Sequence, residues 1–187
     1  MAQKNNSSEN VGLHPGAAAP GGDKLPRRKN LRAEFHDYSG GDYFVTICTR
    51  DKEHYFGRIH EGEMVFSEIG KMADLYLKEL HTHYSYVAVP QWVVMPNHVH
   101  AIISIREPAD APGCIPTIRT ALGVVVGGYK QAVTRYARRH NIYFGWQPRF
   151  HDHIIRGIAD GNKISEYIEN NTARWDTDCF NYTNRPK

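Results

Sequence analysis

The sequence has little cysteine and no long apolar run, and both absences narrow the class of protein. Its three cysteines, Cys48, Cys114 and Cys179, stand far apart and form no Cys-x-x-Cys pair. That spacing argues against a disulfide framework and a zinc–thiolate site, and it suits a reducing compartment. No segment approaches about 18 consecutive apolar residues, and the first residues lack the apolar core of a secretory signal. We therefore expect a cytoplasmic protein without a membrane partner.

Acidic residues are also scarce, but only in one part of the chain. Residues 119–156 contain seven Lys or Arg residues and a single acidic residue, Asp152, although the net charge is only +3. Such a local excess suits a polyanion such as nucleic acid, and a solvated surface without a partner is the alternative. The candidate nucleic-acid contacts are Arg28, Lys130, Arg135, Arg138, Arg139, Arg149 and Arg156.

The composition predicts one globular domain after an N-terminal tail. Residues 1–26 are rich in Ala, Gly, Pro and Ser and carry few large apolar groups, so we expect them to be disordered. The remainder, residues 27–187, is long enough to bury a substantial core.

Within this domain the patterns predict three strands, a helix, three further strands, a second helix, an extended segment and a last helix. Strands or extended segments are expected at 43–49, 55–59, 63–66, 86–89, 91–95, 98–104 and 144–155. Helices are expected from an N-cap at Ser67 to residue 80, at 118–140 with an interruption or kink near Gly127-Gly128, and at 162–174. This order predicts an α+β fold, an antiparallel sheet backed by helices.

The strongest local signal is a pair of histidines, His98 and His100, inside an apolar, strand-like run. Side chains in a strand alternate between faces, so both imidazoles project side by side, as the first two ligands of a divalent metal do. Two hydrogen-bonded histidines without a metal are the alternative. No cysteine or third histidine follows nearby, so the pattern favours an Mg²⁺ or Mn²⁺ site completed by oxygen ligands.

A second candidate group lies in the last expected helix, at Tyr167 and Asn171. Residues four apart share a helix face. A tyrosine hydroxyl is a usable nucleophile where a metal and basic groups draw negative charge from its target, and an amide oxygen would complete a metal site. The alternative is a helix that packs Tyr167 against the sheet and ends on Asn171 as a cap.

Six short motifs connect these groups. They are Arg28–Leu31, Tyr43–Thr46, Met95–His100, Trp146–Phe150, His153–Arg156 and Tyr167–Asn171. In this order the chain, over residues 27–176, resembles the single-tyrosine HUH transposases, and most closely the branch called REP-associated tyrosine transposases.

The resemblance implies a ferredoxin-like HUH endonuclease fold. It also implies a metal-dependent endonuclease and strand transferase acting on single-stranded DNA with a hairpin, of the repetitive palindromic or transposon-end type. His98, His100 and Asn171 would bind Mg²⁺ or Mn²⁺, and Tyr167 would form a 5′-phosphotyrosine link. Members of the family act as monomers or homodimers.

Two positions depart from the family pattern. Thr172 stands where a proline usually follows the two asparagines, which affects the helix end rather than the chemistry. Tyr129 stands where relatives often carry phenylalanine, so it is a second candidate nucleophile, with packing as the alternative role. We expect His151 and His153 to be structural or to contact DNA rather than to bind metal.

Two other functions stay open at this point. One is a domesticated DNA-binding regulator with an inactive site, which would form no covalent adduct through Tyr167. The other is a metal-dependent hydrolase of a small phosphorylated substrate, such as a histidine-triad enzyme. That activity calls for a third alternating histidine, and residue 102 is isoleucine.

Overall fold

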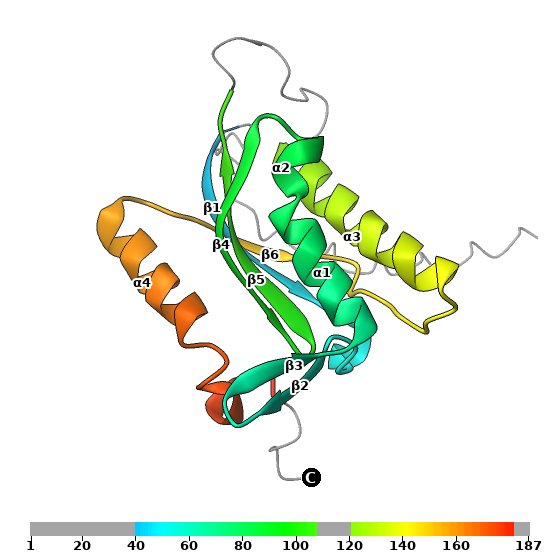
Figure 1. Ribbon diagram of the computed structural model, residues 1–187. Coiled ribbons are helices and arrows are strands. Elements are labelled where there is room, and N and C mark those ends of the chain that lie inside the picture. The colour runs from blue at the N-terminus through cyan, green and yellow to red at the C-terminus, as the bar shows by residue number, and fades with distance from the viewer. Residues whose placement is uncertain (1–39, 108–120, 182–187) are drawn as a thin grey trace, which may run out of the picture. The chain divides into compact units, whose positions relative to one another are not determined.

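The computed structural model describes residues 40–107 and 121–181, and within them four strands form an antiparallel sheet in the order β4-β5-β1-β6 (Figure 1). A separate two-stranded sheet pairs β2 with β3. The strands are β1 (Gly41–Cys48), β2 (Gly57–His60), β3 (Glu63–Phe66), β4 (Val87–Met95), β5 (His98–Ile105) and β6 (His151–Ile154). The helices are α1 (Glu68–Lys78), α2 (Leu80–His83), α3 (Ala121–Arg139) and α4 (Ile158–Glu169), with 3-10 turns at Arg50–Lys52 and Trp175–Thr177. The predicted α+β class is confirmed.

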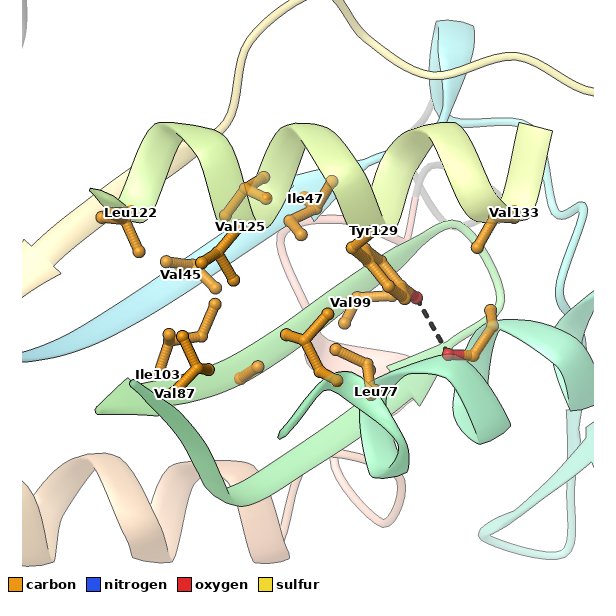
Figure 2. Close-up of a cluster of buried hydrophobic side chains, with 14 of the residues drawn as sticks. Val45, Ile47, Leu77, Val87, Val99, Ile103, Leu122, Val125, Tyr129 and Val133 are labelled. Atoms are coloured by element: carbon orange, nitrogen blue, oxygen red, sulfur yellow. Dashed lines mark hydrogen bonds between the residues drawn. The ribbon is translucent and has the colours of Figure 1, made fainter. Parts of the chain in front are cut away.

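The sheet has one apolar face and one mixed face because side chains alternate along each strand. On the apolar face, Val45 of β1 and Val99 of β5 belong to one buried cluster with Val125 of α3, as Figure 2 shows. Helices α1, α2 and α3 cover this face, and α4 lies on the other side of the sheet (Figure 1). The alternate residues of β1 and β5, including Thr46 and His100, therefore face the side of α4. No helix in the described ranges is long and apolar enough to cross a membrane.

Strand β4 is one continuous edge strand, where the sequence pattern predicts two separate extended segments. Its pairing with β5 shifts between Ala88 and Gln91. Pro90 lies in this interval and has no N–H to donate to a sheet ladder. An edge strand accommodates such a residue because one of its sides has no neighbouring strand.

Helix α1 begins at the predicted N-cap, Ser67. Its side-chain oxygen accepts a hydrogen bond from the backbone N–H of Gly70 at 3.1 Å. Gly70 is required for a close approach, since a Cβ there would lie 2.0 Å from the backbone oxygen of Phe56. The strands predicted at 55–59 and 63–66 are also confirmed, and they pair with each other as β2 and β3.

Helix α3 is continuous over Ala121–Arg139, so the interruption predicted near Gly127-Gly128 is wrong. Burial of an apolar face along the whole helix outweighs the low helix propensity of two glycines. A Cβ at Gly128 would lie 2.0 Å from the Tyr84 hydroxyl, whereas a Cβ at Gly127 would meet nothing within 4 Å. The first residues of the predicted helix, 118–120, lie outside the described residues.

Helix α4 starts earlier than the predicted residue 162. The carboxylate of Asp160 accepts hydrogen bonds from the backbone N–H of Arg156 at 3.0 Å and from His153 at 2.9 Å. These contacts hold the first turn, and a negative charge there is favourable for the helix dipole. The sequence pattern gives no sign of them because they depend on the position of β6.

Helix α4 also ends earlier than the predicted residue 174. The helix stops at Glu169, and Asn170 is its C-cap, with its backbone N–H bonded to the oxygen of Glu166 at 3.1 Å. Asn171 therefore lies in the following turn rather than on the helix. Its N–H still bonds to the oxygen of Ile168 at 3.3 Å, so the chain continues to turn in the same sense.

The glycines Gly70 and Gly127 should respond in opposite ways to alanine. Gly70→Ala places a methyl group against the Phe56 carbonyl, so we expect the free energy of unfolding to fall by about 1–3 kcal/mol. Gly127→Ala meets open space inside α3, so the free energy of unfolding should rise by about 0.5–1 kcal/mol. Urea unfolding followed by circular dichroism measures both changes. A Gly70→Ala variant as stable as the parent would contradict this packing.

Candidate active site

His98 and His100 lie at the start of β5, on the sheet face toward α4. They are in register with Cys48 and Thr46 of β1, and their ring centroids are 4.5 Å apart. Both side chains are buried, with exposed fractions of 0% and 1%. The structure thus has the side-by-side arrangement that the strand pattern predicts.

The side chain of Asn97 determines which nitrogen of His98 carries a proton. Its amide nitrogen donates to the backbone oxygens of Lys52 at 3.1 Å and Phe180 at 2.8 Å. Its side-chain oxygen is therefore the acceptor for His98 Nδ1, which lies 2.8 Å away. With the proton on Nδ1, the Nε2 atom of His98 keeps a lone pair, the form that binds a metal.

His100 has a neighbour at each ring nitrogen. Its Nδ1 lies 2.9 Å from Thr46 Oγ1, and its Nε2 lies 3.2 Å from the hydroxyl of Tyr167. The ring of Phe44 stacks on the imidazole with centroids 5.1 Å apart. These contacts fix the plane of the ring relative to the sheet.

Burial keeps both imidazoles neutral at pH 7. It lowers the pKa of His100 to about 3. Burial, followed by the neighbouring His100, lowers the pKa of His98 well below its usual value. A neutral imidazole is the form that can donate a lone pair to a metal ion.

Tyr167 and Asn171 reach the histidines from the end of α4. Tyr167 is 37% exposed and its ring centroid lies 5.2 Å from that of His100, while Asn171 is only 2% exposed. Burial raises the pKa of the Tyr167 hydroxyl, Asp178 adds to this rise, and a hydrogen bond with the Asn171 side chain opposes it. The predicted proximity of the two residues is present, although the helix ends between them.

Helix α4 is attached to the sheet partly by polar contacts. Ile168 is its one buried residue. Gln91 of β4 donates to the backbone oxygen of Ser165 and to the carboxylate of Glu169, both at 3.1 Å, and it accepts a hydrogen bond from the Ser165 hydroxyl. Tyr167 is therefore carried by a helix with a single fully buried side chain.

Two buried side-chain atoms in residues 40–107 and 121–181 have no hydrogen-bond partner, and both belong to this group. They are His98 Nε2 and Asn171 Oδ1. A buried acceptor without a partner costs about 1–3 kcal/mol, so the pair indicates a ligand that would bind there. Together with His100 Nε2, they provide two imidazole nitrogens and an amide oxygen, a donor set that suits a divalent cation.

An amide ligand is needed for such a site. The described ranges contain no group of three His, Cys, Asp or Glu side chains that could hold a metal ion. Asn171 would supply the third donor from a different residue type. These residues fit the proposed metal.

Aromatic side chains from the end of the chain cover the histidines. The ring of Phe180 lies 4.4 Å from that of His98, and the ring of Trp175 lies 6.2 Å from it. The ammonium of Lys52 lies 4.4 Å from the centroid of Phe180. Sequence reasoning missed Asn97 and Phe180. The position of Asn97 directly before His98 is a usable signal, whereas nothing in the sequence around Phe180 indicates its contact with β5.

Tyr129, the second candidate nucleophile, lies on the opposite face of the sheet. It is 2% exposed, and its hydroxyl donates to the backbone oxygen of Ala73 at 3.1 Å (Figure 2). Burial raises the pKa of this hydroxyl well above its usual value. A phenol enclosed in the core has no path to a DNA phosphate, so Tyr129 has the packing role.

The candidate DNA contacts on α3 do not lie around Tyr167. Arg135, Arg138 and Arg139 are exposed on α3, which lies across the sheet from α4 (Figure 1). The ammonium of Lys130 donates to the backbone oxygen of Gln147 at 2.6 Å, and burial lowers the pKa of Lys130. This contact gives Lys130 a structural role in holding the segment before β6.

The remaining candidates flank β6, beside β1. Arg149 and Arg156 are exposed before and after this strand. His151 is exposed and in register with Thr46, on the face that carries His100. His153 is bonded to Asp160 of α4, a structural contact. Arg28 and the predicted N-terminal tail lie outside the described residues.

Comparison with known proteins supports the fold and supplies a relative. No protein-family model matches the chain. A protein of Haemophilus influenzae described as uncharacterized is 32% identical over 167 residues, covering 82% of this chain and 93% of that protein. The chain belongs to the same family as this Haemophilus protein.

One solved structure supports the fold of this chain. A REP-associated tyrosine transposase bound to a REP hairpin has a TM-score of 0.53 at 19% identity, over 79% of this chain and 74% of that one. The likeness confirms the predicted HUH fold. A putative transposase of Deinococcus radiodurans has a TM-score of 0.39 at 18% identity, over 76% and 97% of the two chains.

Loss of the hydroxyl should affect stability differently at Tyr129 and Tyr167. Tyr129→Phe removes a hydrogen bond inside the core, so we expect the free energy of unfolding to fall by about 1 kcal/mol. Tyr167→Phe removes a hydroxyl on a partly exposed side chain, and its effect should stay within about 0.5 kcal/mol. Urea unfolding of both variants tests this, and equal losses would contradict the two placements.

Proposed function

We propose that this chain is a metal-dependent endonuclease and strand transferase, a transposase, that acts on single-stranded DNA through Tyr167. One observation carries the proposal. The Tyr167 hydroxyl lies 3.2 Å from His100 Nε2, in the same group as the two buried acceptors without partners, His98 Nε2 and Asn171 Oδ1. The proposed nucleophile therefore lies beside the proposed metal ligands.

His98, His100 and Asn171 would hold Mg²⁺ or Mn²⁺. When bound, such an ion draws negative charge from a scissile phosphate. Asn97 keeps the proton of His98 on Nδ1, and Thr46 orients His100 through its own Nδ1. Neutral His98 thus presents Nε2 without a change of tautomer, and neutral His100 presents Nε2 when its proton is on Nδ1, toward Thr46.

Tyr167 performs the covalent step. Its oxygen forms a bond to phosphorus while the bond from phosphorus to the 3′-oxygen breaks. The phenol loses its proton, and the leaving 3′-oxygen gains one. The products are a 5′-phosphotyrosine on Tyr167 and a free 3′-hydroxyl.

The same link allows joining without a nucleotide cofactor. The phosphotyrosine conserves the energy of the broken phosphodiester, so a second 3′-hydroxyl can attack it and release Tyr167. The partial exposure of Tyr167, 37%, leaves its side chain accessible to a DNA strand. His98 and His100 themselves are buried.

The proposed substrate is single-stranded DNA that carries a hairpin. The similar solved structure is bound to a REP hairpin, and the basic residues of this chain suit a nucleic-acid backbone. Arg149 and Arg156 flank β6, which carries His151 on the face of the site, so they would contact DNA near Tyr167. The chain would act as a monomer or a homodimer.

A covalent adduct tests the nucleophile. The protein is incubated with Mn²⁺ and a labelled library of single-stranded hairpins, and adducts are separated on a denaturing gel. We expect an adduct that peptide mass spectrometry assigns to Tyr167, and complete loss of it in Tyr167→Phe. Tyr143→Phe is the matched control, because Tyr143 is 77% exposed and lies outside the site.

Two results would contradict this mechanism. An adduct that persists in Tyr167→Phe would assign the chemistry to another residue. Hairpin binding without an adduct in Mg²⁺ or Mn²⁺ would favour the DNA-binding regulator with an inactive site.

Direct titration with Mn²⁺ tests the metal site apart from DNA cleavage. Calorimetry should show Mn²⁺ binding that weakens at least about tenfold in His98→Ala and in Asn171→Ala, since each removes a donor atom. Asn97→Ala should weaken binding by about 10–100-fold although Asn97 does not contact the ion, because His98 loses the acceptor that fixes its tautomer. His60→Ala, an exposed histidine of β2, should bind as the parent does. Equal affinity in all four variants would exclude this site.

A further inference from the structure

A pocket lies on the other face of the sheet from Tyr167, between α1–α2 and α3. Its volume is 440 Å³, within the range of about 300–1,000 Å³ that is common for small-molecule sites. Its lining includes Tyr76, Tyr84 and Tyr136, together with His83, Arg135 and Arg139. None of these side chains lies near Tyr167, and the proposed cleavage step uses none of them.

The pocket is rich in aromatic rings. Tyr136 stacks on His140 with centroids 4.2 Å apart, and its hydroxyl donates to the carboxylate of Glu68 at 2.7 Å. Tyr84 makes an edge contact with Tyr86 at 5.8 Å. The rings of Tyr84 and Tyr136 are therefore held in place, as a surface for stacking a flat ligand requires.

Gly128 forms part of this wall. A Cβ at this position would lie 2.0 Å from the Tyr84 hydroxyl. The absence of a side chain lets the phenol of Tyr84 lie directly against the backbone of α3. This contact explains a glycine in the middle of a continuous helix, where it is otherwise unfavourable.

The pocket is also cationic. Arg135 and Arg139 lie one turn apart on α3, and His83 lines the pocket from α2. No carboxylate is among the lining residues. Neither arginine forms an ion pair with a described residue. Two neighbouring guanidinium groups without a carboxylate suit a phosphate, to which arginine donates several hydrogen bonds.

We propose that this pocket binds a nucleoside phosphate. The base would stack on the tyrosine rings, and the phosphate would bind Arg135 and Arg139. The same chemistry comes from two sources, a free mononucleotide or an unpaired nucleotide of a DNA strand. The inference goes beyond the proposed function, because the site lies across the sheet from Tyr167 and needs no strand cleavage.

Calorimetry with 5-bromo-dUMP tests the free nucleotide. All proteins carry Tyr167→Phe, so that the result does not depend on cleavage. We expect Arg135→Gln and Arg139→Gln each to weaken binding at least about tenfold, the loss of a charge-assisted contact. The control is Arg58→Gln, which removes an exposed arginine of β2 and should change nothing. Bromodeoxyuridine and inorganic phosphate should each bind at least about tenfold more weakly than the nucleotide.

Photo-crosslinking locates the base and distinguishes the two sources. Ultraviolet irradiation should attach 5-bromo-dUMP, or 5-bromodeoxyuridine in a short single strand, to peptides containing Tyr84 or Tyr136. A crosslink from the strand together with no binding of the mononucleotide would assign the site to DNA.

Three outcomes would overturn the proposal. In one, both ligands crosslink elsewhere. In another, Arg135→Gln and Arg139→Gln bind both ligands as tightly as Arg58→Gln does. In the third, inorganic phosphate binds as tightly as the nucleotide, which would leave an anion site without a base.

Discussion

The amide side chain of Asn97 connects the parts of the candidate active site. It accepts from His98, donates to the backbone of Lys52 and of Phe180, and so links β5 to two segments that lie far away in the sequence. The backbone oxygen of Asn97 accepts hydrogen bonds from both the N–H and the hydroxyl of Thr49, each at 2.9 Å. One buried residue thus sets the tautomer of His98 and holds the turn between β4 and β5 against the end of β1.

The sheet separates the apolar core from the polar candidate active site. Its apolar face is filled by α1 and α3, which leaves the alternate residues of β1 and β5 for polar functions on the side of α4. Period-two alternation produces this division without a dedicated loop or cleft. It also explains why Tyr129 and Tyr167 have such different environments, since the sheet lies between them. Helix α3 covers the apolar face of the sheet, so its exposed basic residues lie on the opposite side of the sheet from Tyr167.

Much of this arrangement could be predicted from the sequence, and the failures have a common cause. Strand alternation places His98 and His100 together, and Ser67 marks a helix start, because both signals are local. The predicted break at Gly127-Gly128 is wrong because Gly128 serves a contact with Tyr84, which comes from another element. The predicted start of α4 is wrong because Asp160 is held by His153 of β6, which is distant from the helix pattern. Asn97 and Phe180 act through tertiary contacts that no periodicity reveals.

The weak attachment of α4 has a consequence for motion. Strand β5 is paired on both sides and buried, so displacing His98 or His100 would disrupt the sheet. Displacing α4 breaks the polar contacts of Gln91 and Asp160 and the contact of Tyr167 with His100. It exposes one buried apolar side chain, Ile168, at a cost of about 1.5–3 kcal/mol for that side chain. We therefore expect α4 to open locally at a lower free energy than global unfolding requires. The site combines a fixed pair of histidines with a tyrosine on an element that can move as a unit.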